Sequence, residues 1–130
     1  MELEILGYKH KIIIDSKKLR SECENWDYDP EVTQGLFCKY ERQILVASDI
    51  DSEQILQTVL HETLHAIGSI TGHEVLAHST VKNELFVDAL ANGILNVLKN
   101  KEFYEFIGKA LNFSRNGKRE ADRDGSNTFG

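Results

Sequence analysis

Residues 54–72 read QILQTVLHETLHAIGSITG and hold the pattern His-Glu-x-x-His at residues 61–65. Apolar residues recur through this stretch with the spacing of an amphipathic helix. On a helix of about 3.6 residues per turn, His61 and His65 present two imidazoles to one point, an arrangement typical of zinc ligands. Glu62 is turned by about 100° from His61 and so lies beside a metal rather than on it. There it can act as the general base that takes a proton from water.

This motif helix has clear start and stop signals. Asp51 is an N-cap acceptor and Gln54 stands at the third helical position, which is the capping-box pattern. Gly72 is a suitable C-terminal stop. The side away from the histidines is expected to pack into the core, and it carries Leu56, Val59, Leu60, Ala66, Ile67 and Ile70.

The chain before the motif helix predicts a small sheet. Residues 2–6 and 9–14 are short runs of strand formers joined at Gly7-Tyr8, as in a hairpin. Residues 33–39 and 42–48 predict a second hairpin, so a sheet of three or four strands is expected. A short helix is predicted at residues 16–24. His10 alternates with lysines and is expected to face solvent.

The chain after the motif helix predicts a loop with His73 and His78, followed by two helices. The first, residues 81–98, has apolar residues around almost its whole circumference and is expected to be buried. The second, residues 101–112, is expected to use its aromatic side for packing. The fold class is therefore α+β, an N-terminal sheet followed by helices, in a single domain of residues 1–113. Residues 114–130 are polar and predict a flexible tail.

A catalytic zinc commonly takes three protein ligands and one water, so a third ligand is needed. Glu84 and Asp88 belong to a narrow polar stripe on the 81–98 helix, where a buried carboxylate requires a partner. We therefore expect Glu84 to be the third ligand and Asp88, one turn on, to accept a ring N–H from a ligand histidine. His73 is the alternative ligand. His78 can be a ligand or a loop histidine near the mouth of the site.

The His-Glu-x-x-His motif, followed on the next predicted helix by Asn83-Glu84-x-x-x-Asp88, resembles the gluzincin arrangement of thermolysin-like zinc metallopeptidases. The resemblance implies zinc ligation by His61, His65 and Glu84, general-base catalysis by Glu62, and orientation of His61 by Asp88. Over residues 1–112 this short chain looks more like the minimal metallopeptidases of the ImmA/IrrE and phage-encoded types. That similarity implies zinc held between two helices and a peptide laid along an edge strand.

Two other zinc-peptidase patterns share the His-Glu-x-x-His core. Gly72-His73 resembles the SprT-like proteases, which use a third histidine, and this keeps His73 as the alternative ligand. A metzincin would carry its third ligand three residues beyond Gly68, where Thr71 stands, so the metzincin pattern is absent.

Composition narrows the function classes. A formal net charge of −6 and a pI near 5.3 argue against nucleic acid as a partner. No apolar run approaches the roughly 18–20 residues needed to cross a bilayer, and the N-terminus lacks the order of a signal peptide. No membrane association and a cytoplasmic location are expected. Cys23 and Cys38 lie in no Cys-x-x-Cys pattern and are expected to be reduced. Nothing in the pattern indicates the oligomeric state.

The predicted function is a zinc-dependent metallopeptidase, an endopeptidase, that hydrolyses peptide or protein substrates with Glu62 as the general base. The alternative is a binding or regulatory protein that keeps a zinc site but has no peptidase activity. The intact Glu62 favours the enzyme, because a purely structural metal site needs no base. Tyr104, His73, His78 and Arg42 are equal candidates for stabilising the oxyanion.

Overall fold

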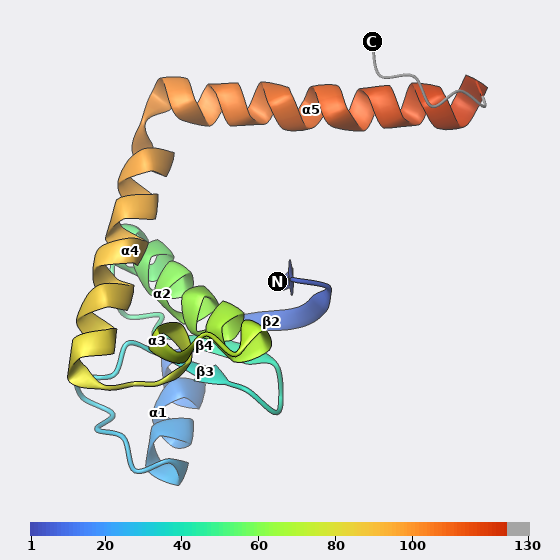
Figure 1. Cartoon of the computed structure of the whole chain (residues 1–130). Helices are drawn as coiled ribbons and strands as arrows, with labels where there is room; N and C mark the ends of the chain where they lie inside the picture. Colours follow the sequence, from blue (N-terminus) through green and yellow to red (C-terminus); the bar gives the residue numbers. More distant parts are fainter. Residues whose placement is uncertain (125–130) are drawn as a thin grey trace. The chain divides into compact units, whose positions relative to one another are not determined.

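A computed structural model describes the backbone of residues 1–124 and the side chains of residues 1–112. The chain forms two compact units, Met1–Leu95 and Asn96–Gly130. The α+β class is confirmed, since a small mixed sheet precedes the long helices (Figure 1). The strands are β1 (Glu2–Ile5), β2 (Tyr8–Ile14), β3 (Gly35–Cys38) and β4 (Gln43–Val46). The helices are α1 (Ser16–Asn25), α2 (Ser52–Thr71), α3 (Glu74–Ala77), α4 (Val81–Lys99) and α5 (Lys101–Asp124).

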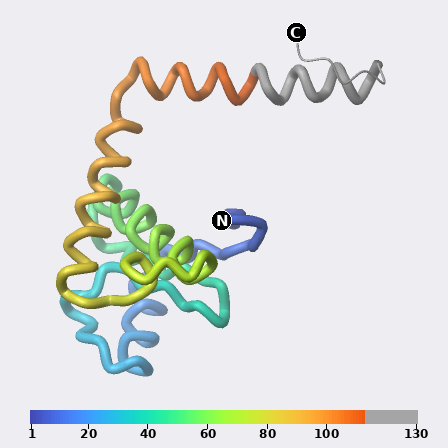
Figure 2. The backbone as a smooth tube through the Cα atoms, viewed as in Figure 1, coloured from blue at the N-terminus to red at the C-terminus, as the bar shows by residue number. Residues whose placement is uncertain are grey.

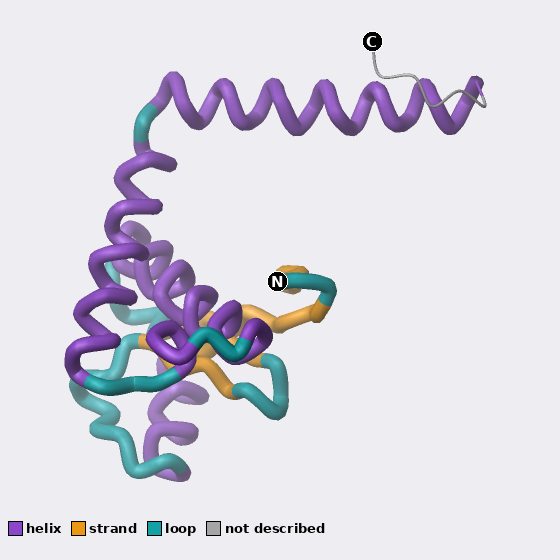
Figure 3. The backbone as a smooth tube through the Cα atoms, in the orientation of Figure 1, coloured by secondary structure: helices purple, strands orange, loops and turns teal. Residues whose placement is uncertain are grey.

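The sheet has four strands in the order β1-β2-β4-β3. The strands are drawn in orange in Figure 3. Both predicted hairpins are present as antiparallel pairs, β1 with β2 and β3 with β4, while β2 and β4 run parallel in the middle. The first hairpin turns at Leu6 and Gly7, which both have positive φ, as a tight two-residue hairpin loop requires. This order leaves β3 as an edge strand with one open side.

Each face of the sheet is covered by one helix. Ile12, Ile44 and Val46 point to α2 and form one core cluster with its Ala66. Residues of the opposite parity, among them Leu45 and Cys38, pack against Leu19 and Cys23 of α1. Successive residues of a strand therefore pack into two different core clusters, one on each face of the sheet. On one of these faces α2 lies directly over the sheet.

The ends of α2 agree with the prediction. The Asp51 side chain accepts a hydrogen bond from the Gln54 N–H at 2.9 Å, and Gly72 ends the helix in the left-handed conformation with φ 69°. Most of the predicted packing residues contribute to the core, but Leu56 is exposed. The motif helix is thus anchored at both ends and along one side.

Two predictions for histidine-containing segments are wrong. His10 is only 2% exposed, because it shares the parity of Ile12 and faces α2, whereas its lysine neighbours occupy the other side of β2. The segment between the two long helices is not a plain loop, since it contains the single helical turn α3. His73 caps that turn by accepting a hydrogen bond from the Leu76 N–H at its Nδ1.

The prediction that the 81–98 helix is buried is also wrong. Only Val87, Ala91 and Leu95 of α4 are buried, and Val87 and Ala91 pack in one cluster with Leu64 of α2. Figure 2 shows the backbone of α4 running beside α2. Other apolar residues are exposed, including Leu85 at 66%. The described aromatics of α5 are not core either, since Phe106 is 66% exposed. Within its unit α4 packs along one stripe, against α2 and Leu76 of α3, so its other side remains exposed.

The predicted domain boundary after residue 113 and the flexible tail of residues 114–130 fall largely outside the described residues. The backbone of α5 is assigned as helix to Asp124, beyond the predicted helix end at residue 112. Among the described helices, none combines the length and apolar character needed to cross a bilayer.

Candidate metal centre

The structure brings His61 and His65 of α2 together with Glu84 of α4. The two Nε2 atoms are 3.1 Å apart. The Glu84 carboxylate spans them, with Oε2 2.8 Å from His61 Nε2 and Oε1 2.9 Å from His65 Nε2. Potential ligand atoms of the three residues lie within 4.8 Å of one another. The predicted set of three therefore converges on one point.

The other ring nitrogens are held by two different elements. His61 Nδ1 lies 2.7 Å from Asp88 Oδ1 on α4, and His65 Nδ1 lies 2.7 Å from the backbone oxygen of Leu76 on α3. A carbonyl and a carboxylate only accept hydrogen bonds, so both Nδ1 atoms must carry the proton. In neutral rings this leaves both Nε2 lone pairs free, and both face Glu84.

Convergence of two nitrogen lone pairs and a carboxylate requires a positive charge between them. Without one, acceptors face acceptors at hydrogen-bond distance, which is electrostatically unfavourable. A proton shared by one ring can satisfy part of this set, whereas a divalent cation satisfies all of it. The three side chains could therefore hold a metal ion.

The spacing of these atoms fits zinc. A tetrahedral zinc with bonds of about 2.0–2.1 Å separates its ligand atoms by about 3.3 Å. The 3.1 Å between the two Nε2 atoms and the 2.8 Å between His61 Nε2 and Glu84 Oε2 need only a small expansion to reach that value. Two imidazoles and one carboxylate are also a donor set that leaves a fourth position for water.

Glu62 lies next to this centre but points to the sheet. Its side chain is 8% exposed and accepts a hydrogen bond from the backbone N–H of Phe37 in β3. Burial raises the pKa of the Glu62 carboxyl to about 7, although the neighbouring His61 and His65 act in the opposite direction. A carboxyl group with such a pKa can both accept and release a proton near neutral pH.

Two glycines make the close approaches around the site possible. A Cβ on Gly35 of β3 would collide with the Thr58 methyl group and would lie 3.1 Å from Cγ of Glu62. A Cβ on Gly68 of α2 would lie 2.6 Å from the backbone carbon of Leu76. The first glycine lets β3 reach Glu62, and the second lets α3 bring its carbonyl to His65.

A cleft of about 670 Å³ runs between β3, α2 and the segment from α3 to α4. Glu62, His65 and Glu84 line it, together with β3 residues and His78. The Ala47 N–H donates to the Gln34 carbonyl, so Gln34 is a residue whose backbone groups face β4. In an antiparallel pair every second residue faces its partner strand, and the backbone groups of Gly35 and Phe37 therefore point away from β4. Those groups therefore lie at the open edge, on the side of the cleft.

The other predicted site residues lie at different distances from the centre. His73 caps α3 and is not part of the converging group, whereas His78 lines the cleft. Tyr104 belongs to the second unit, and Arg42 lines a neighbouring hollow.

Three contributors to the site were absent from the sequence-based predictions. The Leu76 carbonyl and the Phe37 N–H could not be predicted, because backbone groups have no residue-specific signal. Gly35 within a strand run was a usable signal of close backbone approach.

Comparison of the chain with protein-family models, with curated proteins and with solved structures finds no match. The geometry of the site is therefore the basis for assigning a function.

Proposed function

We propose that this protein is a zinc-dependent peptidase of the minimal gluzincin type, with His61, His65 and Glu84 as zinc ligands and Glu62 as the general base. The observation that carries the proposal is the meeting of two Nε2 lone pairs and the Glu84 carboxylate, with both Nδ1 protons committed elsewhere. A buried carboxyl group beside that meeting point and an open cleft in front of it supply the other two requirements of hydrolysis.

Each residue of the site has a distinct task in this proposal. When bound, zinc supplies Lewis acidity, which makes a water more acidic and a carbonyl more electrophilic. Glu62 removes the proton from the attacking water and delivers it to the leaving amine. Asp88 and the Leu76 carbonyl keep the two rings turned so that Nε2 faces inward. The outward N–H and carbonyl of Gly35 and the outward carbonyl of Phe37 can pair with an extended peptide.

His78 is the candidate for stabilising the oxyanion that the described geometry favours. It lines the same cleft as Glu62 and His65, whereas His73 is engaged in capping α3. Its imidazole can donate a hydrogen bond to charge that develops on the substrate oxygen.

The alternative, a zinc-holding regulatory protein without activity, is separated from the enzyme by Glu62→Gln. This variant keeps the shape of the side chain but removes the base. We expect zinc affinity to be unchanged and the cleavage rate of a peptide library to fall roughly 10²–10⁴-fold. Glu24→Gln makes the same charge change on the exposed surface of α1 and is the matched control.

Cleavage is followed by mass spectrometry, and zinc by competition with a chromophoric chelator. Equal cleavage by wild type and Glu62→Gln would refute the proposed mechanism. A zinc-loaded wild type that cleaves no peptide would support the regulatory alternative.

A further inference from the structure

A second hollow, which we call the basic hollow, opens next to the cleft. It has a volume of about 270 Å³ and lies between the start of β2, the end of β3 with its turn, and the last turn of α2. Its lining residues are Tyr8, His10, Phe37, Lys39, Tyr40, Arg42, Ser69 and Ile70. Phe37, Lys39 and Ser69 also line the cleft, so the two spaces share a wall.

The basic hollow has the opposite charge to the rest of the chain. Lys39, Arg42 and His10 line it and no carboxylate does, although acidic residues outnumber Lys and Arg by 21 to 15 in the sequence. Within residues 1–112 neither Lys39 nor Arg42 takes part in an ion pair. The Arg42 guanidinium instead lies 4.7 Å from the centre of the Tyr8 ring, which positions it without neutralising it.

His10 adds a buried polar group to this lining. It is 2% exposed, and its Nδ1 lies 3.0 Å from the Tyr8 carbonyl. A carbonyl accepts only, so Nδ1 is the donor and Nε2 is the free nitrogen. The side chains of the described part offer Nε2 no hydrogen-bond partner, while the ring lines the hollow. In this tautomer Nε2 is an acceptor, so the cationic donors of the basic hollow are those of Lys39 and Arg42.

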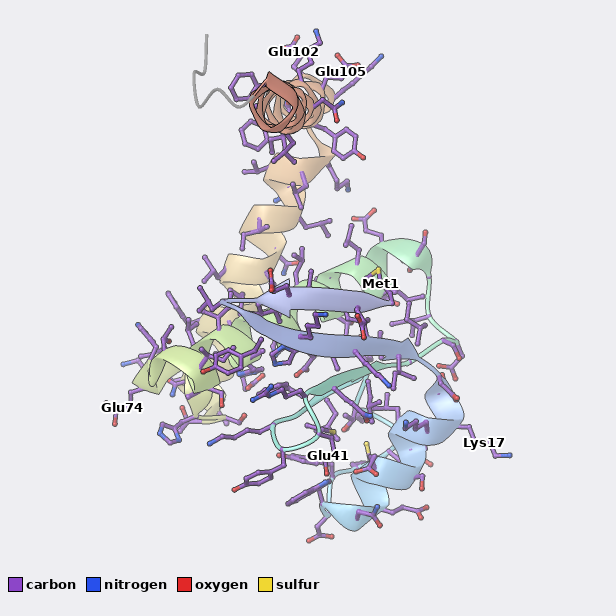
Figure 4. The ribbon with its side chains drawn as sticks, turned by 90° about the vertical axis from the view of Figure 1, so that its right-hand side faces the viewer. Met1, Lys17, Glu41, Glu74, Glu102 and Glu105 are labelled. Atoms are coloured by element: carbon purple, nitrogen blue, oxygen red, sulfur yellow. The ribbon has the colours of Figure 1, made fainter. Side chains whose placement is uncertain are left out.

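The position of the basic hollow relates it to the proposed chemistry. Phe37 N–H binds Glu62, and Lys39 follows two residues later along the same strand direction. Two strand residues span about 7 Å. In a peptide paired with the edge of β3, the bond to be cleaved would lie beside Glu62. The side chain two or three residues away from that bond would then lie near the hollow. Glu41 marks the turn between β3 and β4 in Figure 4, and it lines a different hollow.

We infer that the basic hollow is a specificity subsite that binds a carboxylate of the substrate, so that the enzyme prefers peptides with an acidic residue a few positions from the cleaved bond. The inference rests on the proposed function for its role in catalysis. The carboxylate can belong to an Asp or Glu side chain or to the C-terminus of a short peptide. We assign it to the side chain, because the cleft and the hollow share a wall at Phe37, Lys39 and Ser69, so a side chain of a peptide in the cleft can enter the hollow there.

The test uses a series of paired, labelled peptide pools with amidated C-termini. The two pools of a pair are identical except that one has Glu and the other Gln at one position, and this position differs from pair to pair. Cleavage is measured with zinc-loaded wild type, and binding by fluorescence anisotropy with zinc-loaded Glu62→Gln. At one position we expect Glu to exceed Gln about tenfold in kcat/KM and in affinity, the size typical of a charge-assisted hydrogen bond near the surface. One further pair has Gln at every tested position and either a free or an amidated C-terminus. It tests whether the bound carboxylate is that of the C-terminus.

Lys39→Gln combined with Arg42→Asn should abolish that preference. Asparagine is chosen because Arg42 has a φ of 51°, a conformation that Asn tolerates. Lys17→Gln with Lys18→Gln removes the same charge from α1 and is the matched control, which should keep the preference.

The outcomes separate the two proposals. Cleavage without any Glu preference, or a preference that survives in the Lys39/Arg42 variant, overturns the subsite and leaves the peptidase intact. A preference only for the free C-terminus overturns the side-chain assignment. If no pool is cleaved, the peptidase fails, and the anisotropy difference between Glu and Gln pools still decides the subsite.

Discussion

The two histidines of α2 owe their chemistry to groups outside α2. Their i, i+4 spacing brings the rings together, but the choice of Nε2 as the inward atom comes from Asp88 on α4 and the Leu76 carbonyl on α3. Those acceptors hold the Nδ1 protons and so expose the Nε2 lone pairs. The donor set is therefore complete only when three helices are in place.

The third ligand can be tested at the level of single residues. Glu84→Ala should weaken zinc binding by at least about a hundredfold, because it removes a ligand rather than one of its outer partners. His73→Ala should leave zinc affinity near that of wild type, because His73 caps α3 and lies outside the group of converging ligand atoms. Competition with a chromophoric chelator measures both. If the two variants exchanged these results, the ligand would be His73 and the SprT-like pattern would apply.

At the scale of elements, the single turn α3 is a structural part of the site. It approaches α2 where Gly68 has no side chain, and this contact delivers the Leu76 carbonyl to His65. Without that approach His65 would lose the acceptor that fixes its ring.

Gly68→Ala tests the role of this contact. The new Cβ would lie 2.5 Å from Leu76 Cβ and 2.7 Å from the Ala77 nitrogen, so α3 must move. We expect a loss of about 1–3 kcal/mol in the free energy of unfolding, the usual cost of overpacking, together with weaker zinc binding. Urea unfolding and the zinc competition assay measure the two effects.

Gly93→Ala is the control for helix propensity. Gly93 lies in α4, and an added methyl group would have no neighbour within 4 Å. This change should therefore stabilise the protein by about 0.5–1 kcal/mol and leave zinc binding alone. A stable, fully zinc-binding Gly68→Ala protein would show that α3 does not orient His65.

At the scale of the whole first unit, a bound metal would act as a cross-link. The ligands come from α2 and α4, and those helices otherwise share a modest cluster around Leu64, Val87 and Ala91. A metal that binds only the folded state adds its binding free energy to folding. The attachment of α4 should therefore depend on zinc.

Removal of the metal should consequently lower the thermal stability. At free zinc about a thousandfold above the Kd, the stabilisation is about 4 kcal/mol, or a Tm change of about 10 °C or more for a domain of this size. Calorimetry with zinc and with an added chelator measures the difference, and Glu84→Ala should show little of it. An identical Tm in both conditions for wild type would contradict the cross-link.

Features that depend on near neighbours in the chain were predictable from the sequence. The spacing of His61 and His65, the cap at Asp51, the stop at Gly72 and the two hairpins each involve residues within one turn or one tight loop. The expectation that Glu84 and Asp88 meet His61 also agrees with the structure. The burial on which that expectation was based is absent, since the side chains of Glu84 and Asp88 are 36% and 54% exposed.

Features that depend on which surfaces meet were decided by the tertiary structure alone. His10 reads as an exposed strand residue, yet α2 covers its side of the sheet. The apolar residues of α4 read as a buried helix, yet only the stripe that faces α2 is covered. The sequence determined the local geometry of the candidate site, because helix and turn spacing are short-range. Burial, the ring tautomers and the cleft came from the packing of distant elements, which no local pattern records.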